Sequence, residues 1–107
     1  QRAKDIGDRL LAGLRGLMRK HLLIGDVRGA GLFLGIELVR DRATLAPAPD
    51  QAAYVVNRLR ELGVLTGTDG PHENVIKLRP PLVLSASDAD LFLATLDGVL
   101  SEDPARI

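Results

Sequence analysis

The sequence IGDVRGAGLFLGIELV, residues 24–39, decides the fold of this chain. It is rich in residues that favour strands and is interrupted by Gly29 and Gly31, a pattern typical of two strands joined by a tight bend. Because such a bend joins antiparallel strands, the pattern predicts an antiparallel or mixed sheet. Side chains alternate between the two faces of a strand. One face of the second strand is therefore expected to be apolar, formed by Leu32, Leu34, Ile36 and Leu38.

An amphipathic helix is predicted before this stretch, over about residues 3–21, where apolar residues recur at helical spacing. The segment contains three glycines, Gly7, Gly13 and Gly16. Each glycine costs roughly 1 kcal/mol relative to alanine inside a helix. The helix is therefore expected to depend on tertiary packing.

Two further helices are predicted after it. Asp50 is the expected N-cap of the second, which ends at Gly63. Ser85 and Asp88 form a capping pattern before the third, which is expected to extend to about residue 102. The tail, residues 101–107, is expected to be frayed.

The remaining segments complete the predicted order α, β, β, α, β, β, α. Residues 40–49 have the composition of a loop, residues 64–66 are predicted to form a short strand, and Asp69-Gly70-Pro71 is predicted to form a turn. Residues 75–78 are predicted to form the last strand, which ends before Pro80-Pro81. We expect one α+β two-layer domain over residues 1–107, with a small antiparallel or mixed sheet covered by helices on one face.

Composition excludes several classes of function. The chain has 14 basic and 14 acidic residues, so no surplus charge is available to bind nucleic acid. It has no cysteine, which excludes a disulfide framework and fits a reducing compartment. No apolar run approaches the ~18 residues of a membrane span and no signal peptide is evident. We therefore expect a cytoplasmic protein, and the start at Gln1, immediately before a helical pattern, indicates a fragment.

The residues that could carry chemistry form no complete catalytic set. Gly29-Ala30-Gly31 resembles a phosphate-binding loop, but a strand follows it instead of a helix, so a backbone bend explains it better. His21 and His72 lack partners at metal-ligand spacing and are expected to be surface histidines. The serines are better explained by helix capping or exposure than by nucleophilicity: Ser85, Ser87 and Ser101.

Three basic residues are candidates for binding an anion. Lys77 and Arg79 are two apart on a predicted strand, so both can point to one face and share an anionic ligand. A solvated or salt-bridged sheet edge is the alternative. Arg28 poses the same choice, with an ion pair to Asp26 or Glu37 as its alternative role.

Two segments, GDVRGAGLFLGIELV (residues 25–39) and NVIKLRPPLVLSASDAD (residues 74–90), resemble the C-terminal small domain of class III aminotransferases, which are fold-type I enzymes dependent on pyridoxal phosphate. The resemblance implies a homodimeric enzyme whose large domain binds the cofactor on a lysine, while the small domain closes the active site and helps to bind a small amine or amino-acid substrate. None of Lys4, Lys20 and Lys77 lies in a motif like that of the cofactor lysine. This chain alone is therefore not expected to be catalytic.

The same resemblance gives Lys77 a specific role. In typical aminotransferases of the class, an arginine at this position holds the substrate carboxylate, and Arg79 could substitute for it or face away. The segment TDGPHENVIKLRPPL, residues 68–82, is more similar to a subgroup that eliminates phosphate from phosphoethanolamine or phosphohydroxylysine. We therefore expect part of a transaminase, with a phospho-lyase as the alternative. A non-catalytic binding module that shares the fold is the third hypothesis.

Overall fold

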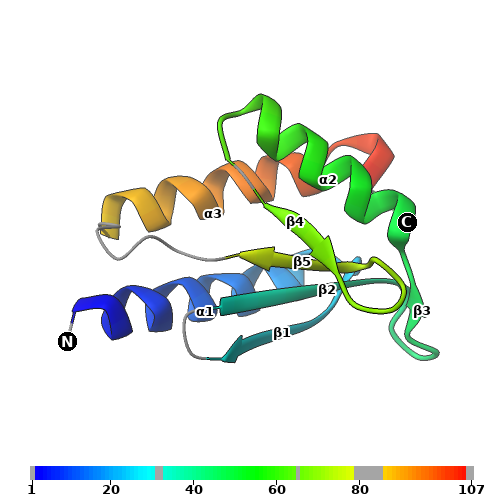
Figure 1. Cartoon of the computed structure of the whole chain (residues 1–107), viewed down its shortest axis with the longest axis horizontal. Coiled ribbons are helices and arrows are strands. Elements are labelled where there is room, and N and C mark those ends of the chain that lie inside the picture. Colours follow the sequence, from blue (N-terminus) through cyan, green and yellow to red (C-terminus); the bar gives the residue numbers. More distant parts are fainter. Residues whose placement is uncertain (1, 31–32, 65, 79–85, 106–107) are drawn as a thin grey trace.

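The computed structural model describes residues 2–30, 33–64, 66–78 and 86–105. They form three α-helices and five strands in one α+β domain (Figure 1). A short 3-10 helix follows the last α-helix. In chain order the elements are α1 (Arg2–Lys20), β1 (Ile24–Ala30), β2 (Phe33–Asp41), β3 (Ala46–Pro47), α2 (Pro49–Glu61), β4 (Gly67–Asp69), β5 (Val75–Leu78), α3 (Ala86–Leu100) and η1 (Asp103–Ala105).

The sheet is antiparallel in every described pairing, with strand order β1-β2-β5-β4 and with β3 paired to β2. Strand β2 is central: Ile36 pairs with Val27 of β1 on one side and with Ile76 of β5 on the other. This register places the apolar residues of three strands on the same face, because directly paired residues point to the same side. The prediction of an antiparallel or mixed sheet is confirmed in its antiparallel form.

All three helices pack on that apolar face. Figure 1 shows α2 and α3 above the sheet and α1 behind it. Their buried residues belong to one hydrophobic cluster with the strand residues, including Leu14 of α1, Val55 of α2 and Leu96 of α3, each almost completely buried. Burial of such side chains is the main stabilising contribution to the fold. The opposite face of the sheet carries no helix among the described residues.

Helices α1 and α3 are held together by a close contact and by charge. Gly13 of α1 faces the side chain of Leu93, so closely that an added Cβ would lie 2.3 Å from Leu93 Cδ1. At one end of the helix pair, Arg9 donates two hydrogen bonds to Asp90, at 2.9 and 2.8 Å. At the other end, Lys20 Nζ lies 2.9 Å from Asp97 Oδ2. Gly13 thus leaves room for the Leu93 side chain, although it weakens the helix locally.

Three predicted boundaries were wrong. Residues 40–49, expected to form a loop, contain the end of β2, the two-residue strand β3 and the start of α2, so the observed order has one strand more than the predicted one. Helix α2 is capped at Ala48, without a side-chain cap, and Pro49 occupies its first turn, so Asp50 is not the N-cap. Pro49 suits this place because its fixed φ matches a helix start and its missing N–H needs no partner there. The strand expected at 64–66 lies at Gly67–Asp69 instead, where it pairs with Val75–Lys77. The turn accordingly moves to residues 70–73, with Gly70 at φ +87°.

The expectation of a frayed tail was also wrong for residues 101–105. The chain continues from α3 into the 3-10 helix η1, and Ala105 is completely buried against the core. The predicted cap Ser85 and the Pro80-Pro81 bend lie outside the described residues.

Candidate functional site

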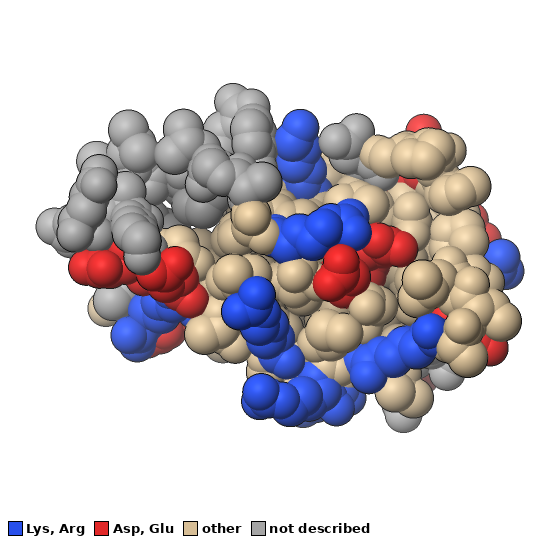
Figure 2. All heavy atoms as spheres, turned by 90° about the horizontal axis from the view of Figure 1, so that it is seen from below, with Lys and Arg blue, Asp and Glu red and all other residues tan. Residues whose placement is uncertain are grey.

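The helix-free face of the sheet holds two of the basic residues singled out in the sequence, Arg28 and Lys77. In the strand register, Arg28 pairs with Gly35, Gly35 with Lys77, and Lys77 with Gly67, so these four residues form one row across β1, β2, β5 and β4. Figure 2 shows basic and acidic side chains beside one another on the face seen from below. The sheet thus presents two cations in one row on the side that the helices leave open.

Lys77 lies near the middle of this row and is exposed. Both of its direct neighbours across the sheet are glycines, Gly35 and Gly67. Neighbouring strands are about 4.8 Å apart, so the side chain of Lys77 has a strip of bare backbone on each side. Arg79, its predicted partner, lies outside the described residues. A joint anion site of the two residues stays a prediction.

Arg28 forms the ion pairs that were its alternative role. Its Nη1 donates to Glu37 Oε1 at 2.9 Å and to Asp26 Oδ2 at 3.0 Å. The hydrogen bond to Glu37 is the largest influence and raises the pKa of Arg28 above its usual value. Since Arg28 has two carboxylate partners, its charge is compensated within the sheet. Its ion-pair role, the alternative given for it in the sequence analysis, is thereby confirmed.

His21 is not the surface histidine that the sequence predicts. Its side chain is only 11% exposed, and Nε2 lies 2.7 Å from Asp97 Oδ1. Hydrogen bonds with His21 and, second, with Lys20 hold the pKa of Asp97 below its usual value. The cluster joins the ends of α1 and α3, and no group of three metal-ligating side chains occurs in the described part of the chain.

The other predicted polar residues are placed singly. His72 is exposed in the turn before β5, as expected, and Ser87 is exposed in the first turn of α3. The hydroxyl of Ser101 donates to the Asp97 carbonyl at 2.9 Å, so this serine satisfies a backbone carbonyl at the end of α3. Gly29 and Ala30 pair with Leu34 and Phe33 as regular residues of β1, so these two residues do not form the predicted bend, and Gly31 is outside the described residues.

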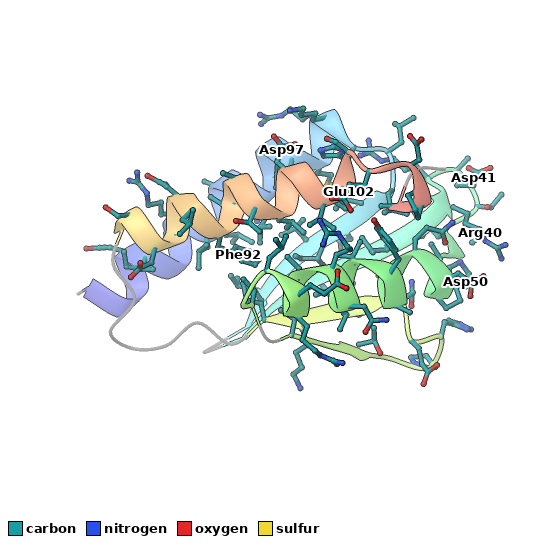
Figure 3. All side chains as sticks on the ribbon, turned by 90° about the horizontal axis from the view of Figure 1, so that it is seen from above. Arg40, Asp41, Asp50, Phe92, Asp97 and Glu102 are labelled. Carbon is teal, nitrogen blue, oxygen red and sulfur yellow. The ribbon has the colours of Figure 1, made fainter. Side chains whose placement is uncertain are left out.

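One polar cluster was missed by the sequence analysis. Glu102 follows α3 and is directed toward α2 (Figure 3), where Arg58 donates to both of its oxygens at 2.8 and 2.9 Å. The Tyr54 hydroxyl also donates to Glu102. Hydrogen bonds from Arg58 and then from Tyr54 lower the pKa of Glu102 to about 2. The cluster fastens the end of α3 to α2 and lies on the helical layer, away from the face that carries Lys77.

The chain matches the model of the aminotransferase class-III family over residues 1–100. It belongs to the class III aminotransferase family. It is 50% identical over 94 residues to an alanine–glyoxylate aminotransferase 2-like protein of Drosophila melanogaster, covering 87% of this chain and 19% of that protein. It is 40% identical to ethanolamine-phosphate phospho-lyase homolog 1 of Caenorhabditis elegans, covering 94% of this chain and 22% of that protein.

A solved structure of a family relative has the same fold. It is a phospholyase from Arthrobacter in complex with phosphoethanolamine, 36% identical, with a TM-score of 0.87 over 94% of this chain and 24% of that one. The fold predicted from the resemblance, the small mixed domain of fold-type I enzymes, is thereby confirmed. The chain spans only about a fifth of the length of the two curated relatives.

The family implies dependence on pyridoxal phosphate, and no site for it is formed by the residues that the structure describes. A lysine that reacts with a carbonyl cofactor is activated by an apolar pocket or by a neighbouring cation. Lys20 has a 60% exposed side chain and is bound to Asp97, while Lys77 is exposed on an open sheet face. Neither environment encloses a cofactor.

No described helix is long and apolar enough to cross a membrane.

Proposed function

We propose that this chain is the small domain, residues 1–107, of a pyridoxal-phosphate-dependent aminotransferase that acts on a small amine or amino-acid substrate. Membership of the class III family carries the proposal. The cofactor would be bound by the large domain of the same polypeptide and would supply the electron sink for transfer of the amino group. The small domain closes the active site over the substrate.

In this proposal the helix-free face of the sheet is turned toward the substrate. The three helices cover the other face, and Lys77 stands exposed on the open one. A lysine ammonium binds an anion as a point charge with three rotatable donors, and it binds phosphate well in this way. Lys77 would hold the anionic group of the substrate, with Arg79 as a second cation.

The test uses the full-length protein loaded with pyridoxal phosphate. An amine or amino-acid donor is supplied with and without a keto acid, and formation of the new amino acid is followed by chromatography. The proposal predicts product that depends on both the donor and the keto acid. Absence of keto-acid-dependent transfer across a panel of amine and amino-acid donors would overturn it.

Elimination of phosphate is the second candidate function. It is favoured by the lysine at position 77, where the aminotransferases that this chain resembles carry arginine, because a substrate without a carboxylate does not need a planar, bidentate partner. Similarity to two proteins named as phospho-lyases supports it further. Phosphate released from phosphoethanolamine at the same rate with and without a keto acid would establish it. Release only in the presence of a keto acid, or none, would exclude it.

We also propose that the full-length protein is a cytoplasmic homodimer without nucleic-acid partners. The balanced charge of the chain supports the last point. Sedimentation of the full-length protein tests the oligomeric state: a dimer mass that persists on dilution is expected, and a monomer at working concentration would contradict the proposal. The remaining hypothesis, a non-catalytic binding module, is favoured only if the full-length protein fails to bind pyridoxal phosphate.

A further inference from the structure

Two glycines border Lys77 on the helix-free face of the sheet. Gly35 of β2 and Gly67 of β4 are its direct partners across the two strand pairs. Glycine weakens a strand interior, since it loses much backbone entropy and offers no side chain for packing. A glycine on each side of one exposed lysine therefore needs a reason.

Backbone conformation does not supply that reason. Among the described residues, the glycines with positive φ are Gly63 and Gly70, in the turns after α2 and β4. Gly35 and Gly67 have ordinary strand conformations that any residue can adopt. A larger residue at either position would not be strained.

Packing within the chain does not supply it either. Among the described residues, a Cβ added at Gly67 meets no atom within 4 Å, and one added at Gly35 meets Val75 Cγ1 at 3.5 Å, an ordinary contact. Elsewhere in the same domain, packing does require glycine: a Cβ at Gly25 would lie 2.7 Å from Val39 Cγ2. As far as the described residues go, both glycines beside Lys77 thus stand at positions where the packing would accept a larger residue. Glycine in a strand often marks a place where a ligand or another chain segment approaches closely.

We propose that Gly35 and Gly67 are specificity-determining positions that keep the sheet surface around Lys77 clear for the anionic group of the substrate. This inference rests on the proposed function. Lys77 supplies the positive charge, and the two glycines supply the room in which a carboxylate or a larger phosphate group can reach it from the side. A side chain at position 67 would occupy part of that room next to the lysine, because directly paired residues have their Cβ atoms about 4.5–5.5 Å apart.

The test substitutes Gly67 in the full-length protein. Gly67→Ala and Gly67→Val form a graded series, and valine also favours strands, so neither change should lower the melting temperature. Thr68→Val is the matched control. Thr68 is the next residue of β4, exposed, and on the opposite face, since it pairs with Ile76 of the core. Binding of phosphoethanolamine, as a phosphate probe, and of alanine, as a carboxylate probe, is measured by calorimetry.

The wild-type protein should bind at least one probe. Gly67→Val should weaken that binding at least about tenfold, the lower end of the effect of a misfit the size of one methylene group. Gly67→Ala should weaken it less, and Thr68→Val should leave it unchanged. A greater loss for phosphoethanolamine than for alanine would identify phosphate as the group accommodated, and the reverse would identify the carboxylate.

Two other results overturn the inference in distinguishable ways. If Lys77→Ala weakens binding but Gly67→Val does not, the glycines have no role in specificity while the proposed role of Lys77 stands. If the wild-type protein binds neither probe, or if Lys77→Ala also has no effect, the anion site itself is refuted together with the proposed role of this face.

Discussion

Replacing Gly13 by alanine tests how α1 is held against α3. The new Cβ would lie 2.3 Å from Leu93 Cδ1 and 3.2 Å from Leu93 Cγ, so the leucine must move. Alanine gains about 1 kcal/mol of helix propensity, and overpacking of this kind costs about 1–3 kcal/mol. The net expectation is a loss of about 1 kcal/mol of unfolding free energy. That loss corresponds to a melting temperature lower by about 4–8 °C.

A second background isolates the contact. In a Leu93→Ala chain the clash is gone and the propensity gain remains, so Gly13→Ala should there stabilise by about 1 kcal/mol. The effect of Gly13→Ala on the unfolding free energy thus differs by about 2 kcal/mol between the two backgrounds, a coupling typical of residues in direct contact. Urea unfolding of the 107-residue chain, followed by circular dichroism, measures all four corners of the cycle.

Gly16→Ala is the matched control in the same helix. An added Cβ at Gly16 meets no atom of the described part of the chain within 4 Å, so this change should stabilise by about 1 kcal/mol in both backgrounds. If Gly13→Ala stabilises the chain with the native Leu93 as much as Gly16→Ala does, the two helices are not in close contact at Gly13 and the reasoning fails.

Three further changes have defined outcomes. The pKa of Glu102 in the folded chain, about 2, lies below its usual value of 4.5, so the contribution of Glu102 to folding stability is complete above about pH 4.5 and is lost as the pH falls toward 2. Glu102→Gln should remove this part of the acid dependence, and urea midpoints between pH 2.5 and 6 that keep the wild-type slope would contradict it. Arg28→Ala should cost only about 0.2–1 kcal/mol, because its ion pairs are exposed, and the cost should shrink in 1 M salt; a larger, salt-independent loss in urea would contradict this. Leu14→Ala should cost about 2–5 kcal/mol in the same assay, because Leu14 is completely buried, and a loss below 1 kcal/mol would contradict its core position.

The elements with strong local periodicity were predictable from the sequence. The alternation of Leu34, Ile36 and Leu38 indicated the apolar face of β2, and all three are buried. The spacing of Val55, Val56 and Leu59 similarly indicated α2. These patterns suffice because one face of each element must be buried, and the periods of a helix and a strand differ. The shift of the third predicted strand to Gly67–Asp69 was not predictable, since β4 is a short edge strand whose position is set by pairing with β5.

The polar clusters depend on contacts between residues far apart in the sequence. Arg58 and Glu102 are 44 positions apart, and His21 and Asp97 are 76 apart. Neither pair has a local spacing that distinguishes it from surface charge, so His21 was predicted to be exposed and Glu102 was placed in a frayed tail. The pairing of Lys77 with two glycines could not be predicted from the sequence either, because it depends on the register of three strands.

The most direct test of the central proposal is the Michaelis constant of the full-length protein after Lys77→Ala. Loss of a hydrogen bond to a charged group, worth about 1.5–3 kcal/mol, should raise KM for the anionic substrate at least about tenfold. Because Lys77 is exposed, the melting temperature should stay at the wild-type value. A raised KM with unchanged melting would support a substrate-facing Lys77. Wild-type kinetics in the variant would contradict it.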